Sequence, residues 1–225
     1  MLTWAMAKNN RMKKNGLKYI VLIAIAGLLL YNSMYFKKLD VQKLVVETNL
    51  NPPDFAKQFW TAKFIPYLDS ALEINSFISM LKGNSKAAFE KFSKTQGIGN
   101  AACFLVKGEG VIKSVSEDEV VVIVKSGSAE TAAKLNTGIY FGNAVRDVTG
   151  KINMGDFGNT MDFNSVSSEL NKIVRTQVVL PFKSKAIKGV TVQFVACAEI
   201  NQEQISTTDI QLLPVKIIMK QIAGN

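Results

Sequence analysis

The sequence predicts an α+β protein in which a membrane anchor helix precedes a small helical lobe and a five-stranded antiparallel barrel. An uncharged apolar run occupies residues 19–36, near the N-terminus. Apolar residues then recur at helical spacing up to about residue 97, after which an alternating, strand-like pattern replaces it. Three strands, one long helix and two further strands follow, which is typical of an OB-like barrel with its helix between strands 3 and 4. An α+β sandwich is the alternative.

The run at 19–36 is long enough to cross a bilayer, because a helix rises about 1.5 Å per residue and would span roughly 27 Å. Five Lys or Arg residues precede it and two follow it directly. This bias favours a cytoplasmic tail at 1–18 and export of the remaining chain. We therefore expect a single-pass protein of the inner membrane with its C-terminal domain in the periplasm. A cleaved signal peptide and a buried helix of a soluble protein are the alternatives.

The net charge of +9 belongs to the N-terminal part of the chain. Residues 1–38 contain seven of the 27 Lys and Arg residues and no acidic residue, which leaves 20 basic and 18 acidic residues in 39–225. A nucleic-acid-binding domain carries a clear basic surface, so we expect no nucleic-acid partner. The chain contains no His, which removes His-ligated metal sites and the usual Ser-His-Asp and Cys-His catalytic groups. We expect no cofactor and no metal ion.

After a polar spacer at 37–51, we expect the helical lobe at 52–97. The segment 51–54, Asn-Pro-Pro-Asp, is typical of a helix start. Four aromatic residues follow at helical spacing, and we interpret them as packing residues rather than a ligand groove: Phe55, Phe59, Trp60 and Phe64. Pro66 should kink or end this helix, and Gly83 and Asn84 should interrupt a later one.

The barrel domain is expected over residues 98–225. Its first three strands are predicted by alternation and by the turns between them, at 101–107, 110–115 and 119–125. A polar loop at 127–135 and a further strand at 139–145 should follow.

A long helix from about residue 164 to 179 should then connect to the last two strands. Its apolar face consists of Phe163, Val166, Leu170, Ile173 and Val174. Pro181 should end the helix. The last strands are predicted at 190–200 and at about 212–222, where Pro214 indicates an edge position or a bulge.

Cys103 and Cys197 both fall in predicted strands. An oxidising compartment would allow a disulfide between them. Two buried free thiols are the favoured interpretation, because a disulfide requires a Cβ–Cβ approach that a sequence does not reveal.

Polar residues that could build a binding site are concentrated between residues 138 and 171. The candidates are Asn143, Arg146, Asp147, Asp156, Asn159 and Asp162. They would form a site if they converge in one cleft. The competing interpretation is that Asp, Asn and Gly build turns and cap the following helix, and that Arg146 and Asp147 form a local ion pair.

The same stretch contains residues for two further chemistries. A calcium-binding loop aligned on Gly150 has Val145 at its first ligand position, which disfavours it. A glycosidase-like pair could be drawn from Asp147, Asp156, Asp162 and Glu169, but their separation across a sugar does not follow from the sequence.

Several strings in the sequence are similar to a known family: YNSMYFKKLD, GIGN followed by FLVKGEG, IYFGNAVRDVTG, DFGNTMDFNSVSSELN and VQFVACAEIN. Together they resemble a bacterial domain-of-unknown-function family of predicted periplasmic lipoproteins, from the anchor to the C-terminus. The resemblance implies a helical lobe joined to an OB-like barrel. It also implies that the gene lies close to genes for sugar-uptake ABC transporters. It implies no established activity and no catalytic residues. Because the first Cys is Cys103, far beyond the apolar run, we expect a peptide anchor in place of a lipid anchor.

These inferences lead to one hypothesis and one alternative. The hypothesis is a non-enzymatic, periplasm-facing envelope protein, accessory to carbohydrate ABC uptake, that binds a sugar or a transporter component. The alternative is a carbohydrate-active hydrolase that uses paired carboxylates.

Overall fold

The computed structural model describes residues 51–95, 100–127, 129–207 and 210–220, together with Tyr19, Leu22 and Ile25. The predicted tail at 1–18, the spacer up to residue 50 and, apart from those three residues, the predicted anchor at 19–36 lie outside the described residues. Within the part that is described, no helix is both long and apolar enough to span a membrane.

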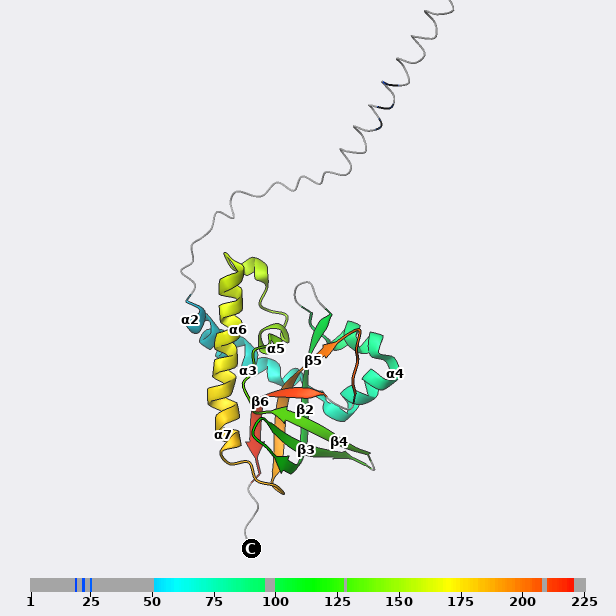
Figure 1. Cartoon of the computed structure of the whole chain (residues 1–225), viewed down its shortest axis with the longest axis vertical. Helices are drawn as coiled ribbons and strands as arrows, with labels where there is room; N and C mark the ends of the chain where they lie inside the picture. The colour runs from blue at the N-terminus through cyan, green and yellow to red at the C-terminus, as the bar shows by residue number, and fades with distance from the viewer. Residues whose placement is uncertain are drawn as a thin grey trace, which may run out of the picture. The chain divides into compact units, whose positions relative to one another are not determined.

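Five strands close into a barrel: β2 (Ala101–Val115), β3 (Glu119–Ser126), β4 (Ala129–Asn136), β5 (Thr191–Asn201) and β6 (Gln211–Met219). Their order is β2-β3-β4-β6-β5, and β2 also pairs with β5, which closes the ring (Figure 1). The β4–β6 pair is parallel and the other pairs of the ring are antiparallel. The short strand β1 (Leu72–Glu73) adds a parallel edge to β2. With the long helix between the third and fourth barrel strands, this is the strand order of an OB fold.

The first barrel strand differs from its prediction. The predicted strands at 101–107 and 110–115 are a single strand, β2, and the glycines between them do not form a turn. Gly110 lies where the backbone of β3 approaches closely, since a Cβ built on it would be 2.2 Å from the carbonyl oxygen of Ile123. A glycine within a strand often marks such an approach. Glycines are also common in turns, so the sequence led to the prediction of a turn at this position.

The third barrel strand also differs from its prediction. It is β4, which occupies most of the segment predicted as a polar loop at 127–135. Its buried residues Ala133 and Leu135 alternate as expected of a strand, but small and polar neighbours weaken the pattern. The predicted strand at 139–145 is instead an irregular segment followed by the short helix α5 (Ala144–Asp147).

The helices before the barrel are α2 (Pro52–Phe59), α3 (Ile65–Tyr67) and α4 (Ile74–Phe92), and those after β4 are α5, α6 (Thr160–Val174) and α7 (Leu180–Lys183). Single 3₁₀ turns occur at Leu68–Ser70 and Met154–Asp156. The predicted helix start is confirmed, since α2 begins at Pro52. The predicted break in the later helix is confirmed at Asn84, where φ is −153° and ψ is 82°.

Neither Pro66 nor Pro181 ends its helix. Each stands in the first turn of a short α-helix, α3 or α7, directly after a π-helical turn, at Trp60–Phe64 or Arg175–Val179. A π-helical turn changes which carbonyl faces each N–H, so the proline ring avoids the clash it would have in a regular α-helix. The helix predicted to end before Pro181 therefore runs on to Lys183.

Two hydrophobic clusters hold these elements together. The first fills the barrel, and α4 covers it: the ring centroids of Phe77 and Phe89 lie 4.8 and 5.3 Å from that of Phe104. The second lies between α2, α3, α6 and the outer face of β2, β5 and β6, and includes Leu105 and Leu170. Helices of the segment 52–97 thus contribute to both clusters, within one compact unit shared with the barrel.

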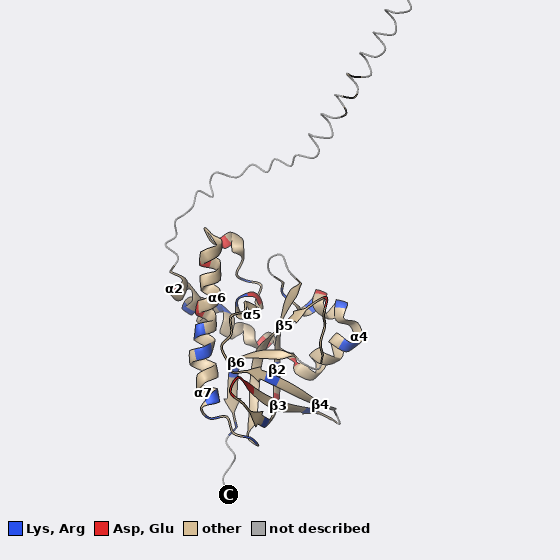
Figure 2. Ribbon diagram, viewed as in Figure 1, with Lys and Arg blue, Asp and Glu red and all other residues tan. Residues whose placement is uncertain are grey.

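The predicted apolar face of the long helix is confirmed, because all five of its residues are buried in the second cluster. Charged residues of both signs are distributed over the outer surface. Figure 2 shows Lys and Arg on α4, α6 and α7, with Asp and Glu interspersed.

Replacing Gly110 by Ala should destabilise the barrel by about 2–3 kcal/mol, because the added methyl group overlaps backbone of the neighbouring strand. Urea denaturation followed by circular dichroism would measure this. Gly83→Ala is the matched control: a Cβ there meets no atom within 4 Å, and Ala is the better helix former. Equal stability of the two variants would contradict this account of Gly110.

Candidate functional site

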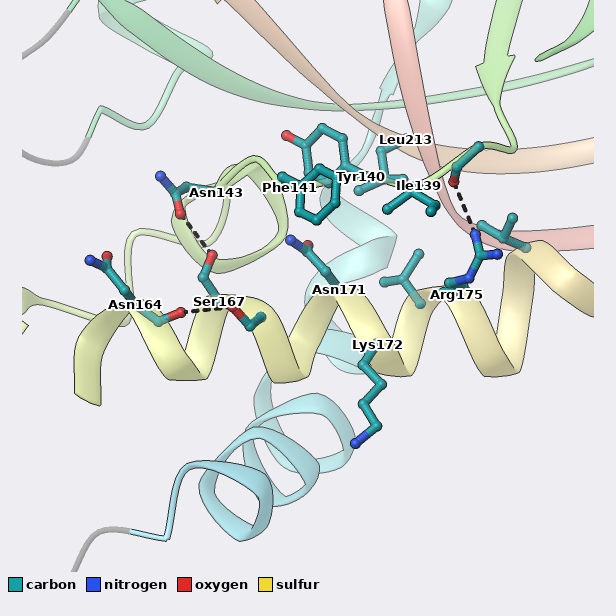
Figure 3. A pocket seen from close by; sticks show the side chains of 14 residues that line it. Ile139, Tyr140, Phe141, Asn143, Asn164, Ser167, Asn171, Lys172, Arg175 and Leu213 are labelled. Carbon is teal, nitrogen blue, oxygen red and sulfur yellow. Dashed lines mark hydrogen bonds between the residues drawn. The ribbon is translucent and has the colours of Figure 1, made fainter. Parts of the chain in front are cut away.

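A groove of about 480 Å³ lies between α6 and the irregular segment 138–143 that follows β4 (Figure 3). We call it the α6 groove. Its lining residues are Gly138, Ile139, Tyr140, Phe141, Asn143, Asn164, Ser167, Ser168, Asn171, Lys172, Val174, Arg175, Val179 and Leu213. Its volume is within the range of small-molecule sites in proteins, about 300–1,000 Å³.

Amide and hydroxyl groups provide most of the polar lining. Ser167 Oγ donates a hydrogen bond of 2.8 Å to Asn143 Oδ1, and Asn171 Nδ2 donates one of 2.8 Å to the Gly142 carbonyl. These two bonds tie the segment 138–143 to α6. The buried Oδ1 atom of Asn171 has no hydrogen-bond partner. A buried acceptor without a partner costs about 1–3 kcal/mol.

Aromatic and apolar side chains form the opposite wall of the groove. Phe141 is 88% exposed and Ile139 is 65% exposed, although both are large and apolar. Tyr140 is better buried: its hydroxyl donates to Glu199 Oε2 at 3.1 Å and accepts from the Ala144 N–H at 3.4 Å. Burial, followed by the nearby Glu199 charge, raises the pKa of Tyr140, so the hydroxyl stays protonated at neutral pH.

Both cationic side chains of the lining have partners within the protein. Lys172 points away from the groove in Figure 3, and its Nζ lies 3.6 Å from Glu169 Oε2. Arg175 Nη1 donates to the Gly138 carbonyl at 3.3 Å. The fourteen lining residues include no Asp or Glu. The α6 groove is thus lined mainly by neutral polar groups and faced by an exposed aromatic ring.

The six residues predicted as a site do not share one cleft. Asn143 lines the α6 groove. Arg146 and Asp147 are 4% and 6% exposed and form a bidentate pair, with Nε–Oδ1 and Nη2–Oδ2 distances of 2.6 and 3.0 Å. The guanidinium carbon of Arg146 lies 3.7 Å from the ring centroid of Phe163. The pair belongs to the packing of α5 against α6, as the ion-pair interpretation expected.

The remaining three predicted residues are held in local hydrogen bonds near the start of α6. Asp156 accepts from the Asn153 N–H at 3.2 Å, and Asn159 Oδ1 accepts from the Asp162 N–H at 2.8 Å. Asn159 Nδ2 also donates to Asp162 Oδ2 at 2.9 Å. These residues cap a turn and a helix, which is the competing interpretation given from the sequence.

Sequence reasoning missed most of the groove. Ser167, Asn171 and Arg175 recur every fourth residue along the helix, and that spacing places them on one face. This polar stripe is the signal that was available. The exposed Phe141 was not recognised because its stretch was predicted to be a strand, in which an aromatic side chain is ordinary.

Cys103 and Cys197 are buried free thiols in the second hydrophobic cluster. Cys197 pairs with Leu105 in the register, so the two cysteines occupy diagonal positions on neighbouring strands. Burial raises the pKa of Cys103 to about 12 and that of Cys197 well above its usual value. Both thiols therefore stay protonated and unreactive at neutral pH. Among the described residues, no three His, Cys, Asp or Glu side chains gather in a way that could hold a metal ion.

The barrel and its flanking helices define an OB-fold protein. A crystal structure of an OB-fold protein from Thermotoga maritima MSB8, at 1.90 Å resolution, is similar to this chain, with 25% identity and a TM-score of 0.68. The match covers 76% of this chain and 98% of that one. A comparison with curated proteins finds no significant match.

The chain belongs to the family described as "Predicted periplasmic lipoprotein (DUF2291)", which matches residues 24–218. The family resemblance stated from the sequence is thereby confirmed, as is the OB-like barrel. The link to sugar-transporter genes is not tested by these matches and stays a prediction.

Removing one member of the buried ion pair should be more harmful than removing both. Arg146→Met leaves the Asp147 carboxylate buried without its partner and should cost about 3–5 kcal/mol of stability. The double variant Arg146→Met/Asp147→Leu should recover part of that loss. Urea unfolding of both variants and the wild type measures the difference, and a single variant no less stable than the double one would contradict it.

Proposed function

We propose that this protein is a non-catalytic binding protein of the cell envelope whose α6 groove holds a neutral carbohydrate. The observation that carries the proposal is the lining of that groove: amides and hydroxyls along α6, and an exposed aromatic ring on Phe141. A sugar presents hydroxyl groups that both donate and accept hydrogen bonds. Its C–H faces pack well against an aromatic ring.

The groups along α6 match a polyol better than an ion. Asn and Ser side chains each donate and accept, as hydroxyl groups do, so one hydroxyl of a ligand can bridge two of them. Figure 3 shows the Asn171 side chain directed from α6 toward Phe141 on the facing wall of the groove. Lys172 is turned away from the groove, and Arg175 donates a hydrogen bond to the Gly138 carbonyl.

Binding is favoured over hydrolysis by the positions of the carboxylates. A glycosidase of the usual kind needs two carboxyl groups on either side of the scissile bond. Asp147 is paired with Arg146, Asp156 and Asp162 cap local structure, and Glu169 lies beside Lys172. None of these four carboxylates lines the α6 groove.

The proposal includes a cellular location and a protein partner. We place the domain on the periplasmic side, attached through residues 19–36, on the strength of the family and of the charge bias around the apolar run. The family resemblance noted in the sequence adds a sugar ABC transporter as the system that would use the bound ligand. A component of that transporter is then the expected protein partner.

Isothermal titration of the full chain, in a detergent without a sugar headgroup, against D-glucose, D-galactose, D-mannose, D-xylose, L-arabinose and D-ribose tests the ligand class. We expect at least one sugar to bind, and Phe141→Ala to weaken that binding about tenfold through loss of the stacking surface. Asn171→Leu should abolish it, because it removes the hydrogen bond to the Gly142 carbonyl that ties the segment 138–143 to α6.

Met161→Ala is the control, since Met161 is 73% exposed on the same helix but does not line the groove. If no sugar in this panel binds, or if the two groove variants bind as tightly as the control does, the α6 groove is not a carbohydrate site.

Mild crosslinking of intact membranes followed by purification of this protein tests the partner. Subunits of a sugar ABC transporter should copurify in amounts that depend on the crosslinker. An unrelated membrane protein with the same affinity tag is the control. Recovery of the same subunits with both baits would remove the transporter from the proposal.

A further inference from the structure

A second cavity of about 420 Å³ lies beside the α6 groove, against the outer face of the barrel. Its lining residues are Ala101, Asn136, Tyr140, Gly142, Cys197, Glu199, Asn201, Gln211 and Leu213. We call it the barrel cavity, although it lies outside the barrel, against its strands. Tyr140 and Leu213 line both the barrel cavity and the α6 groove, so the two spaces adjoin across these side chains.

The barrel cavity has lining chemistry similar to that of the α6 groove. Three amide side chains contribute to it, from Asn136, Asn201 and Gln211. The Oδ1 atoms of Asn136 and Asn201 accept backbone N–H groups at 2.9 Å each, which orients the amides and leaves their Nδ2 groups as donors for a ligand. The volume is again within the usual range of ligand sites.

One difference separates the two spaces: the barrel cavity contains a carboxylate, Glu199. Its Oε2 atom accepts the Tyr140 hydroxyl at 3.1 Å, and the residue lies on the exposed part of β5. An ionised carboxylate accepts stronger hydrogen bonds from hydroxyl groups than an amide does. Two adjoining sites with unequal hydrogen-bonding strength would bind the two ends of a chain-like ligand differently, and so would set its direction.

Tyr140 is built into the junction between the two spaces. Its hydroxyl bonds to Glu199, and the absence of a side chain at Gly142 makes room for it, since a Cβ there would lie 2.1 Å from the tyrosine oxygen. The Gly142 carbonyl in turn accepts from Asn171 on α6. These contacts fix the Tyr140 ring between the α6 groove and the barrel cavity. One ligand could extend over this ring from one space into the other.

We propose that the ligand is a linear oligosaccharide of at least two sugar units, with one unit in the α6 groove, the next in the barrel cavity, and the linkage over Tyr140. This inference rests on the proposed carbohydrate function and extends it from a single sugar to a chain. Linking two units makes the second contact intramolecular, so affinity should rise steeply from the monosaccharide to the disaccharide.

Titration of the full chain with matched series tests this: glucose, maltose and maltotriose; glucose, cellobiose and cellotriose; xylose, xylobiose and xylotriose; mannose and β-1,4-mannobiose. We expect the disaccharide of at least one series to bind ten times more tightly than its monosaccharide, or better. Monosaccharide binding without such a gain in any series overturns the second site and leaves the proposed function standing. Absence of all binding overturns both.

Ala101→Trp tests the barrel cavity directly, because Ala101 is exposed at the start of β2 and a large side chain there fills the space. The tenfold gain should disappear while monosaccharide affinity stays within twofold of the wild type. Lys113→Trp, at another exposed position on β2, is the matched control and should keep the gain.

A gain that survives Ala101→Trp would overturn the proposal, and so would an equal loss of monosaccharide and disaccharide binding. If Ala101→Trp unfolds, as judged by circular dichroism, the double variant Asn201→Ala/Gln211→Ala takes its place with the same expectations. That variant removes two amides of the barrel cavity and no residue of the α6 groove.

Discussion

The pairing of β2 with β5 is the constraint on which the rest of the molecule depends. It runs over eleven residue pairs, from Ala101 opposite Asn201 to Val111 opposite Thr191, and it closes the barrel. Because side chains alternate between the two faces of a strand, this register decides which residues fill the barrel and which face the helices. A shift by one residue would move Glu199 away from Tyr140. It would also turn the strand residues of the second hydrophobic cluster toward the inside of the barrel.

A second layer of contacts connects the barrel to the groove. The buried Arg146–Asp147 pair, with Phe163 beneath its guanidinium, packs α5 against α6, and hydrogen bonds from Ser167 and Asn171 hold the preceding segment. These contacts need no ligand. The groove is therefore preformed, which reduces the ordering cost that a ligand would otherwise bear on binding.

The family and the site provide complementary information about function. The family description places the chain among predicted periplasmic lipoproteins and names no activity. The α6 groove and the barrel cavity supply a chemistry: neutral amides and hydroxyls, one exposed ring and one carboxylate. Amide and hydroxyl groups both donate and accept hydrogen bonds, so these surfaces can pair with a polar ligand.

Features that depend on neighbouring residues could be predicted from the sequence. The helix start at Pro52, the break at Asn84, the apolar face of α6 and the strand β5 follow from capping, chain entropy and periodicity, each of which acts within a few turns. The predicted order of three strands, a helix and two strands agrees with the barrel only because the division of β2 into two strands offset the omission of β4. Two strands were misassigned where glycine or alanine weakened that local pattern, in β2 and β4.

The α6 groove and the barrel cavity were decided by the tertiary structure. Their residues Tyr140, Asn171 and Glu199 come from a loop, a helix and a strand, and no local pattern relates them. Conversely, Asp156 and Asp162 are candidate ligand-binding residues in the sequence, but in the fold they accept hydrogen bonds from the Asn153 N–H and from Asn159 Nδ2. The sequence by itself determined the family of this protein and several of its elements, among them the start of α2, the apolar face of α6 and the strand β5. Barrel closure and helix packing decided which polar groups meet, because those contacts join residues far apart in the chain.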